Sequence, residues 1–277
     1  MAAHPFFRRP KDVVLLEDVL LFMQQTSLCR NSPIFVTMAS VGSDLYWQMI
    51  ENFMYTMQRF DILPCALMIC VSDAICLQKC RENAFPCFDY QHESSHEGGG
   101  VGEPPHTMEQ IAHLKLFHIP KALAKGVDVF TLDLDVGFFA NPLSLIRDYQ
   151  TSSADAFVQQ DLVFIMHRSP ERWKEWWTEP MPNIGIMLCK GNARTVAMFA
   201  HAWKLYQQID DSKNRDGGRS IKVNPGKDQN KVVAAMRSAR KRGAFQWEYF
   251  SNTSAVLIDK LYKFVNLSIE LGGVVWI

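Results

Sequence analysis

The stretch from Val127 to Pro142 constrains the fold of this chain most. Its sequence, VDVFTLDLDVGFFANP, follows Gly126, starts with β-branched, aromatic and aliphatic residues, and closes on Asn141-Pro142. A short apolar run between such boundaries predicts a buried strand of a parallel sheet. Asp133 and Asp135 stand where this strand should end. Because side chains alternate along a strand, both carboxylates should share one face of the extended backbone.

The two carboxylates suggest a bound cation. Burying like charges side by side is costly unless a cation neutralises them, and carboxylates suit Mg²⁺ or Mn²⁺. A bare Asp-x-Asp triplet also occurs at solvated loop mouths and helix caps. Its place at a strand end favours a ligand, because open α/β sheets bind ligands outside the carboxyl ends of their strands. We therefore predict that Asp133 and Asp135 bind Mn²⁺ or Mg²⁺.

The remaining pattern predicts an α/β fold with a mostly parallel central sheet flanked by helices. A chain of 277 residues can form one large domain or two small ones, and we favour one. We expect a lead-in and helix over 1–32, and a domain over 33–277 with flexible loops at 90–107 and 210–226. The predicted strands are 33–39, 65–71, 85–88, 127–132, 154–161, 182–189 and two short runs after 256; the predicted helices are 12–25, 44–61, 74–83, 108–125, 143–149, 193–209 and 228–239.

Charge and hydropathy exclude some classes of protein. Lys and Arg total 29, as do Asp and Glu, so no global positive field attracts nucleic acid or anionic membrane. No run of 18 uncharged apolar residues occurs, so we expect a soluble chain without a membrane segment. Its compartment stays open: cytoplasmic, or Golgi-luminal if an anchor is missing from this chain. Sequons at Asn252 and Asn266 are weak evidence.

The cysteines form an odd set without the paired spacing of a structural zinc site. Several fall in apolar runs, where a free thiol behaves as a small hydrophobic group. We expect buried reduced thiols, with a Cys76–Cys80 or Cys80–Cys87 bridge as the less favoured alternative. The seven are Cys29, Cys65, Cys70, Cys76, Cys80, Cys87 and Cys189.

Polar residues at other element ends are candidates for the same site. Asp73 follows the second strand, where it can bind a ligand, cap the next helix, or do both. Gly185 inside a strand suggests close approach of backbone or ligand. Asp228 and Gln229 open a helix, where their side chains can face the mouth of the sheet or cap the helix. The aromatic cluster over 173–177 is either a sugar-binding surface or a packing anchor.

Taken together, these motifs resemble the nucleotide-diphospho-sugar transferase family of GT-A glycosyltransferases over residues 33–268. The resemblance implies a Rossmann-like GT-A domain that transfers a sugar from a nucleotide diphosphate, mostly with retention. Its most specific parts are Lys125-Gly-x-x-Val-Phe-x-x-Asp-x-Asp-Val136 with Asn141-Pro142, then Asn183-Ile-Gly185 with Asn192, and Asp228-Gln229; weaker parts are Asn52, Asp73 and Lys115.

The resemblance also implies roles for single residues. The base and ribose of a donor, expected to be a UDP-sugar, would lie near the first two strand ends, and Lys115 would add positive charge at the phosphates. The acceptor would be a glycan or a glycoprotein. The implied catalytic residues are Asp228, Gln229 and Asn183; the donor-binding residues are Ala39, Ser40, Asp73, Lys115, Asp133, Leu134, Asp135 and Gly185, with Asp133 and Asp135 on the metal.

Two alternatives remain beside an active transferase. The family commonly takes a third metal ligand, often His, from near the C-terminus, but no His follows His201 here. Water or Asp259 could fill that place, or the chain could be a catalytically degenerate nucleotide-sugar-binding or scaffold protein. A sugar-phosphate nucleotidyltransferase is disfavoured, because Met38 to Ser43 lacks the Gly-rich loop and activating Arg that such enzymes need.

Overall fold

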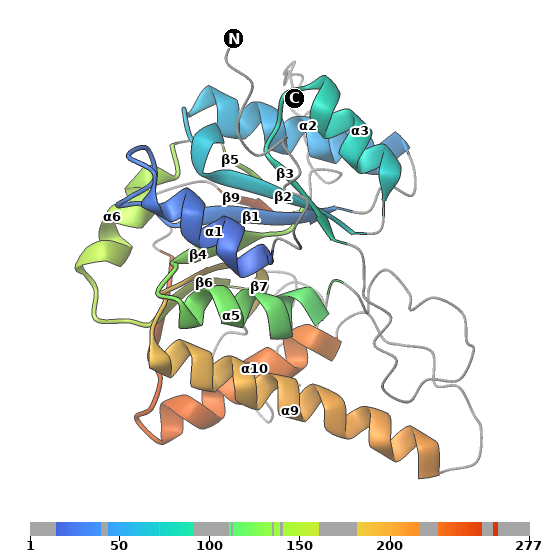
Figure 1. Ribbon diagram of the computed structural model, residues 1–277. Helices are drawn as coiled ribbons and strands as arrows, with labels where there is room; N and C mark the ends of the chain where they lie inside the picture. Colours follow the sequence, from blue (N-terminus) through green and yellow to red (C-terminus); the bar gives the residue numbers. More distant parts are fainter. Residues whose placement is uncertain are drawn as a thin grey trace, which may run out of the picture.

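The molecule is a layered α/β structure, seen in a computed structural model (Figure 1). A central sheet lies between helices on its two faces. The structure describes residues 15–39, 44–71, 73–90, 111, 113–134, 136–138, 141–160, 182–215, 227–250 and 257–259.

The central sheet has seven strands in the order β3-β2-β1-β4-β7-β6-β8. Every neighbouring pair is parallel except the two that involve β7, so β7 alone runs against the others. The predicted mostly parallel α/β sheet is therefore confirmed. The strands are β1 (Ile34–Ala39), β2 (Ala66–Val71), β3 (Cys87–Tyr90), β4 (Val129–Leu132), β6 (Ala156–Gln160), β7 (Pro182–Cys189) and β8 (Trp247–Tyr249).

A second, two-stranded sheet follows the central strand β4. It pairs β5 (Val136–Phe138) with β9 (Leu257–Asp259) in antiparallel fashion, with Val136 opposite Asp259. The chain thus returns, more than a hundred residues later, to a position beside the segment that leaves β4. This pairing brings the backbone of Asp259 close to the predicted metal motif.

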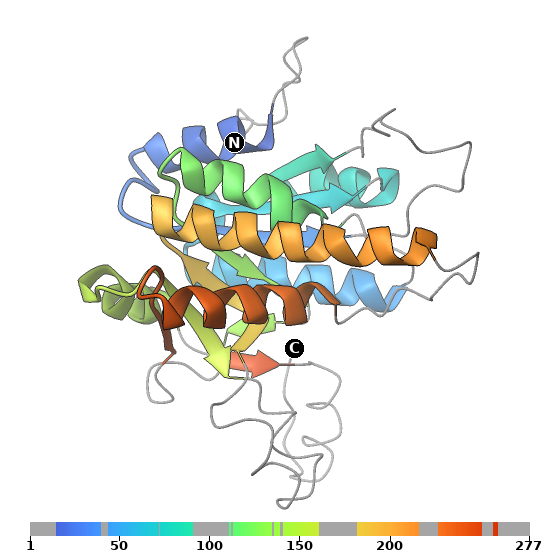
Figure 2. The same cartoon turned by 90° about the horizontal axis from the view of Figure 1, so that it is seen from below.

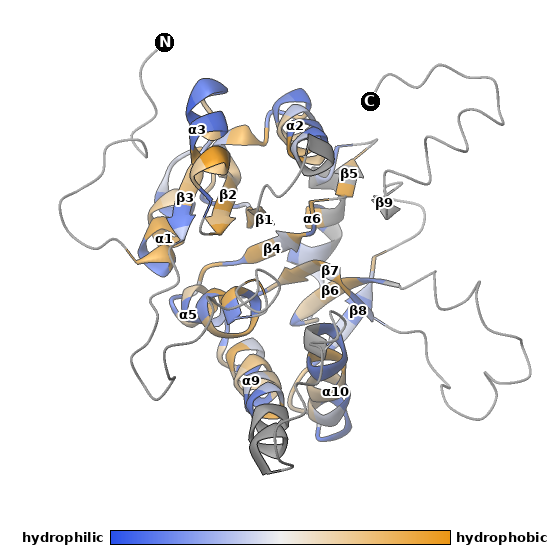
Figure 3. Cartoon of the chain, turned by 90° about the vertical axis from the view of Figure 1, so that its right-hand side faces the viewer, coloured by the Kyte–Doolittle hydropathy of each residue, from blue (hydrophilic) through white to orange (hydrophobic). Residues whose placement is uncertain are grey.

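Helices form a layer on each face of the sheet. In Figures 1 and 3, α2 and α3 lie on one side, and α5, α9 and α10 on the other. Figure 2 shows α9 and α10 running side by side. The α-helices are α1 (Leu16–Gln25), α2 (Asp44–Arg59), α3 (Ala74–Glu82), α5 (Ile119–Ala124), α6 (Leu143–Thr151), α9 (Ala193–Arg215) and α10 (Lys227–Lys241).

The helical segment before β4 departs from regular α geometry. Leu114–His118 forms a π-helical turn that continues into α5, where Pro120 occupies the first turn. Such single turns interrupt α-helices often at functional sites. Gly126 then ends the segment with φ +82°, a conformation that glycine adopts without penalty. The chain therefore enters β4 directly from this segment.

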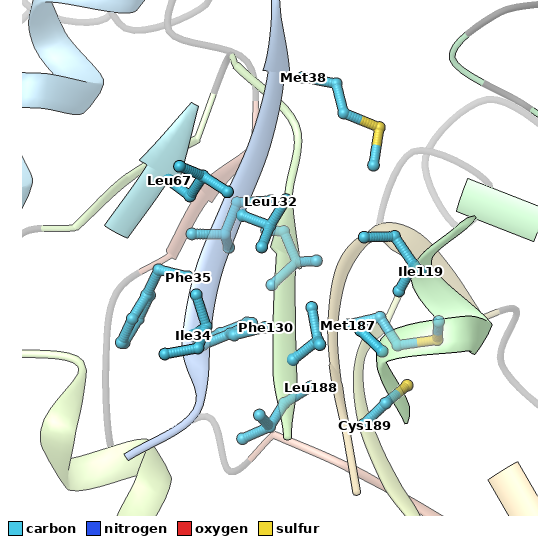
Figure 4. Close-up of a cluster of buried hydrophobic side chains, with 14 of the residues drawn as sticks. Ile34, Phe35, Met38, Leu67, Ile119, Phe130, Leu132, Met187, Leu188 and Cys189 are labelled. Atoms are coloured by element: carbon cyan, nitrogen blue, oxygen red, sulfur yellow. The ribbon is translucent and has the colours of Figure 1, made fainter. Parts of the chain in front are cut away.

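The core forms between the sheet and both helix layers. All residues of β1, β2 and β4 are buried, as expected for parallel strands covered on both faces. Figure 4 shows Ile119 of α5 on the side of Met187 of β7, and Phe35 across β1 from them. Figure 3 shows the apolar strands enclosed by helices whose outer faces are more polar. The strands are thereby fixed in position, which makes their ends a rigid base for a site.

The expectation of reduced cysteines was wrong for six of the seven. Disulfides join Cys29 to Cys65, Cys70 to Cys76 and Cys80 to Cys87, and Cys189 is a buried free thiol. The less favoured Cys80–Cys87 bridge is present, and Cys76–Cys80 is not. The pairs link positions on different elements, which spacing along the chain does not reveal.

Other differences concern element ends. The strand β8 was not predicted, and α9 continues through Arg215, so the start of the predicted second loop is helical. The division into lead-in and domain remains a prediction. The tryptophan cluster over 173–177 lies outside the described residues. No helix in the described ranges has the length and apolarity that a membrane crossing needs.

Candidate functional site

One edge of the central sheet gathers the predicted site residues. The parallel strands β1, β2 and β4 end at this edge, and β7 begins there because it runs in the opposite direction. The backbone N–H of Asp133, just after β4, donates to the carbonyl oxygen of Gly185 in β7 at 2.7 Å. This edge, which we term the mouth, thus combines a strand end with a strand start.

Asp133 and Lys115 form an ion pair at the mouth. Lys115 lies on the π-helical turn, and its Nζ is 2.7 Å from Oδ1 of Asp133. The lysine side chain is 13% exposed, whereas that of Asp133 is 48% exposed. Oδ2 of Asp133 has no hydrogen-bond donor among the described residues. One oxygen of this carboxylate is therefore held by the protein, and the other can take a ligand.

Gly185 leaves the space that the Asp133 carboxylate occupies. A Cβ atom added at Gly185 would lie 2.3 Å from Oδ2 of Asp133 and 3.0 Å from Oδ1 of Asn183. Asn183 Oδ1 also accepts a hydrogen bond from the Gly185 N–H at 2.9 Å. The sequence predicted an approach of backbone or ligand at this glycine, whereas the group that lies closest in the structure is the side-chain carboxylate of Asp133.

Asp73 caps the helix that follows β2. Its Oδ1 accepts hydrogen bonds from the N–H groups of Ile75 and Cys76, at 2.9 and 3.0 Å. The predicted cap is confirmed, while a contact of Asp73 with a ligand stays a prediction. The Cys70–Cys76 disulfide closes the same turn and fixes the end of β2 to the start of α3.

Helix α10 begins at the mouth. Gln229 Nε2 donates to the carbonyl oxygen of Pro182, the first residue of β7, at 3.4 Å. Asp228 lies in the first turn of the same helix, although its side chain is not among those described. The structure therefore brings the backbone of the Asp228-Gln229 pair to the start of the strand that carries Asn183 and Gly185.

The other predicted donor residues lie on the same edge or outside the described residues. Ala39 is the buried last residue of β1 and pairs with Cys70 of β2. Leu134, beside Asp133, is buried, so its side chain belongs to the core. Ser40 and Asp135 fall outside the described residues, although the described segments on either side of Asp135 place its neighbours at the mouth.

A break in strand pairing adds a residue that the sequence did not suggest. Strands β6 and β7 pair at Val158 with Met187, then resume at Gln159 with Asn183, so that residues 184–186 have no partner on β6. Gly185 stays paired with β4 throughout this bulge. Gln159 therefore lies beside Asn183. An amide within a strand matches no motif, and only the register reveals it.

The arrangement combines groups that suit a charged, polyoxygen ligand. A half-exposed carboxylate, an ammonium and several amides lie within one short stretch of the sheet edge. A hard divalent cation would find oxygen ligands here. The sulfur cluster of Cys70, Cys80 and Cys87 does not compete, because all three sulfurs are in disulfides.

Comparison with solved structures finds distant likenesses. A putative glucose-1-phosphate thymidylyltransferase from Bacillus anthracis, in complex with a sucrose, is 11% identical with TM-score 0.44, covering 88% of this chain and 97% of its own. The galactosyltransferase LgtC, in complex with donor and acceptor sugar analogs, is 13% identical with TM-score 0.45, covering 72% and 70%. Mouse xyloside xylosyltransferase 1 in its apo form is 14% identical with TM-score 0.45, covering 80% and 98%.

The comparison of sequences is more specific. No curated protein matches the chain. A family model described as nucleotide-diphospho-sugar transferase matches residues 65–268, a range that spans β2 to β9 and includes Asp133, Gly185 and Gln229. The chain therefore belongs to the nucleotide-diphospho-sugar transferase family, and it is a glycosyltransferase.

Proposed function

We propose that this glycosyltransferase is metal-dependent and moves a sugar from a UDP-sugar to a hydroxyl of a glycan or protein-linked acceptor, with retention. The observation that carries the proposal is the Asp133 carboxylate at the end of β4, with one oxygen on Lys115 and the other beside Gly185. Among the described residues, Oδ2 of Asp133 has no hydrogen-bond donor, and it lies at the mouth of the sheet, where ligands of such folds bind.

The donor nucleotide would lie across the strand ends. Its base and ribose would contact the ends of β1 and β2, near Ala39, Ser40 and Asp73. Lys115 would face the diphosphate, since its ammonium already lies at the mouth next to Asp133. Leu134 would support this region from the core.

Asp133 and Asp135 would hold the Mn²⁺ or Mg²⁺. The fit rests on the absent side chain of Gly185, because a Cβ atom there would lie 2.3 Å from Oδ2 of Asp133 and displace this oxygen. When bound, a divalent ion neutralises charge on a departing diphosphate. Asp259 is our candidate for a third ligand, because the β5–β9 pairing sets its backbone opposite Val136, next to Asp135.

Asn183, Gln229 and Asp228 would surround the reacting sugar. Hydrogen bonds fix Asn183 to Gly185 and Gln229 to Pro182, so both amides are anchored where β7 begins. Preorganised dipoles of this kind stabilise charge that develops in a transition state. Asp228 would orient hydroxyl groups or stabilise the cationic sugar centre, while a phosphate oxygen of the donor takes the proton of the acceptor.

Nucleotide release from UDP- and GDP-sugars tests the proposal. The wild type, Asp135→Ala and the distant surface variant Gln246→Met would be assayed with Mn²⁺ and with EDTA. We expect release by the wild type and by Gln246→Met with Mn²⁺ alone, and none by Asp135→Ala. An additional Asp259→Asn variant should bind Mn²⁺ about 10-fold more weakly, the loss typical of a metal-site residue. Release that persists in EDTA would overturn the metal assignment.

A catalytically degenerate binding protein is the second candidate. In its favour, residues 202–277 hold no His that could supply the third metal ligand implied by the family resemblance. Mn²⁺-dependent UDP binding in calorimetry, without release from any donor, would establish this candidate. Absence of both binding and release would contradict the metal site itself.

The disulfides support an oxidising compartment, such as the Golgi lumen, over the cytoplasm. Three bridges in one chain are typical of proteins that fold where thiols are oxidised. Alkylation of the denatured protein from its native cells, followed by mass spectrometry, should modify Cys189 alone. Modification of all seven cysteines would favour the cytoplasm.

A further inference from the structure

A buried acceptor at the mouth lacks a donor. Oε1 of Gln159 is buried and has no hydrogen-bond partner within the described part of the chain. Buried polar atoms in folded proteins are nearly always paired, so such an exception needs an explanation. Two further buried polar atoms with no hydrogen-bond partner within the described residues lie away from the mouth: Thr37 is central in β1, and Trp247 begins β8.

The register places this acceptor beside the reacting groups. Gln159 pairs with Asn183, and the side chains of directly paired residues lie on one face of a sheet with Cβ atoms ~5 Å apart. Oδ1 of Asn183 and Oδ2 of Asp133 both border Gly185. The register thus places Gln159 of β6, Asn183 of β7 and Asp133, just after β4, next to one another across three neighbouring strands.

A bulge of β7 borders the pair of Gln159 and Asn183. Residues 184–186 have no partner on β6, so the β6–β7 ladder is interrupted between Val158 and Gln159. Bulges next to active sites commonly redirect side chains. Within the same stretch of β7, the Gly185 carbonyl oxygen accepts from the Asp133 N–H, so the bulge lies between the metal side of the mouth and the Gln159 side.

We propose that Oε1 of Gln159 accepts a hydrogen bond from a hydroxyl of the donor sugar and thereby sets which sugar the enzyme uses. The proposal rests on the proposed function, because it takes the mouth as the donor site. The hydroxyl is a matching donor group, and a site built for one hydroxyl discriminates strongly against a sugar that lacks it. Gln159 would act on the sugar and leave the nucleotide untouched.

Calorimetry with UDP and with intact UDP-sugars tests whether Gln159 contacts the sugar and not the nucleotide. The full chain would be titrated in Mn²⁺ with UDP, UDP-glucose, UDP-galactose and UDP-xylose, as wild type, Gln159→Met and Gln159→Ala. Gln246→Met is the matched control, since the Gln246 side chain is exposed at the start of β8. For both Gln159 variants we expect unchanged UDP affinity and roughly 10-fold weaker binding of the UDP-sugar that the wild type prefers.

Each other outcome is decisive. Equal UDP-sugar affinity in wild type and both Gln159 variants would overturn the proposal, since the oxygen would then contact no sugar hydroxyl. A joint fall of UDP and UDP-sugar affinity, with a lower Tm, would assign Gln159 a structural role and overturn it too. If the wild type binds UDP but no UDP-sugar, Gln159 is not a sugar determinant; if it binds neither, the proposed function itself fails.

Discussion

Both ends of the central sheet carry aspartates, but these aspartates differ in burial and in hydrogen bonding. At the mouth, Asp133 is half exposed and has one charged partner among the described residues, Lys115. At the opposite end, Asp155 is completely buried. Its Oδ1 accepts from Asn192 and Arg194, at 3.0 and 2.8 Å, and its Oδ2 from the Gln246 N–H at 2.9 Å. Among the described residues, donors reach both oxygens of the far carboxylate but only one oxygen of the near one.

This difference separates a structural role from a functional one. A buried charge is tolerated when hydrogen bonds saturate it, and Asp155 ties β6, α9 and the approach to β8 together in this way. Asp128, just before β4, lies at the same end of the sheet, and its Oδ1 accepts from the Gly191 N–H. An aspartate that the fold leaves incompletely bonded at a strand end is the better candidate for ligand binding.

The largest expected effect comes from removing the buried carboxylate. Asp155→Ala should destabilise the fold by about 3 kcal/mol, because donors from two side chains and one backbone group lose their acceptor. Asp133→Ala should change stability by less than about 1 kcal/mol, since its partner pair is partly solvated. Urea unfolding followed by fluorescence measures both. Equal losses would remove the distinction between the two ends.

The glycines at the two ends provide the next comparison. A Cβ at Gly191 would lie 2.4 Å from the backbone carbonyl carbon of Gly126, whereas one at Gly185 would meet the Asp133 side chain. Gly191→Ala should therefore cost about 1–3 kcal/mol, the usual range for overpacking. Gly185→Ala should fold nearly as well but lose Mn²⁺ binding, because the carboxylate must move. Thermal melts with Mn²⁺ titrations would check this, and a large Tm loss in Gly185→Ala would contradict it.

Replacing Lys115 tests the role of its ammonium group at the mouth. Lys115→Met should alter stability by less than about 1 kcal/mol, because an apolar residue of similar length replaces a largely buried ammonium. Under the proposed function, UDP should bind about 10-fold more weakly, with Mn²⁺ binding retained, since a charged hydrogen bond to phosphate is lost. Calorimetry measures the affinities for UDP and for Mn²⁺ separately. Unchanged UDP affinity would place Lys115 outside the donor site.

The smallest effect concerns pH. Burial raises the pKa of Asp128 above its ordinary value of 3.8, so the folded state holds this proton more tightly than the unfolded state. Stability should then fall as pH rises from about 4 through the folded pKa, and level off above it. Asp128→Asn has no such group. The unfolding free energy of the wild type should therefore fall relative to that of Asp128→Asn as pH rises through this range. A difference between the two proteins that does not change with pH would contradict the raised pKa.

Local patterns allowed part of this structure to be predicted. The apolar run before Asp133 specifies β4, and Asp73 specifies the start of α3, because each depends on neighbouring residues alone. The antiparallel direction of β7, the disulfides and the bonds of Asp155 depend on residues far apart in sequence. Periodicity carries no information about them. Gln159 was not predicted as a site residue for the same reason, since its environment arises from a register shift between two strands.

The reversed direction of β7 also has a consequence for how this enzyme family can diversify. Gln160 closes β6 opposite Pro182, which opens β7, so the connection between them leaves and rejoins the sheet at the mouth. Doubling the length of a flexible connection costs only about 0.6 kcal/mol. Under the proposed function, insertions between these two residues can therefore change what surrounds an incoming acceptor while β6 and β7 keep their register. Substrate range can then evolve through the length of one connection, at little cost to the stability of the sheet.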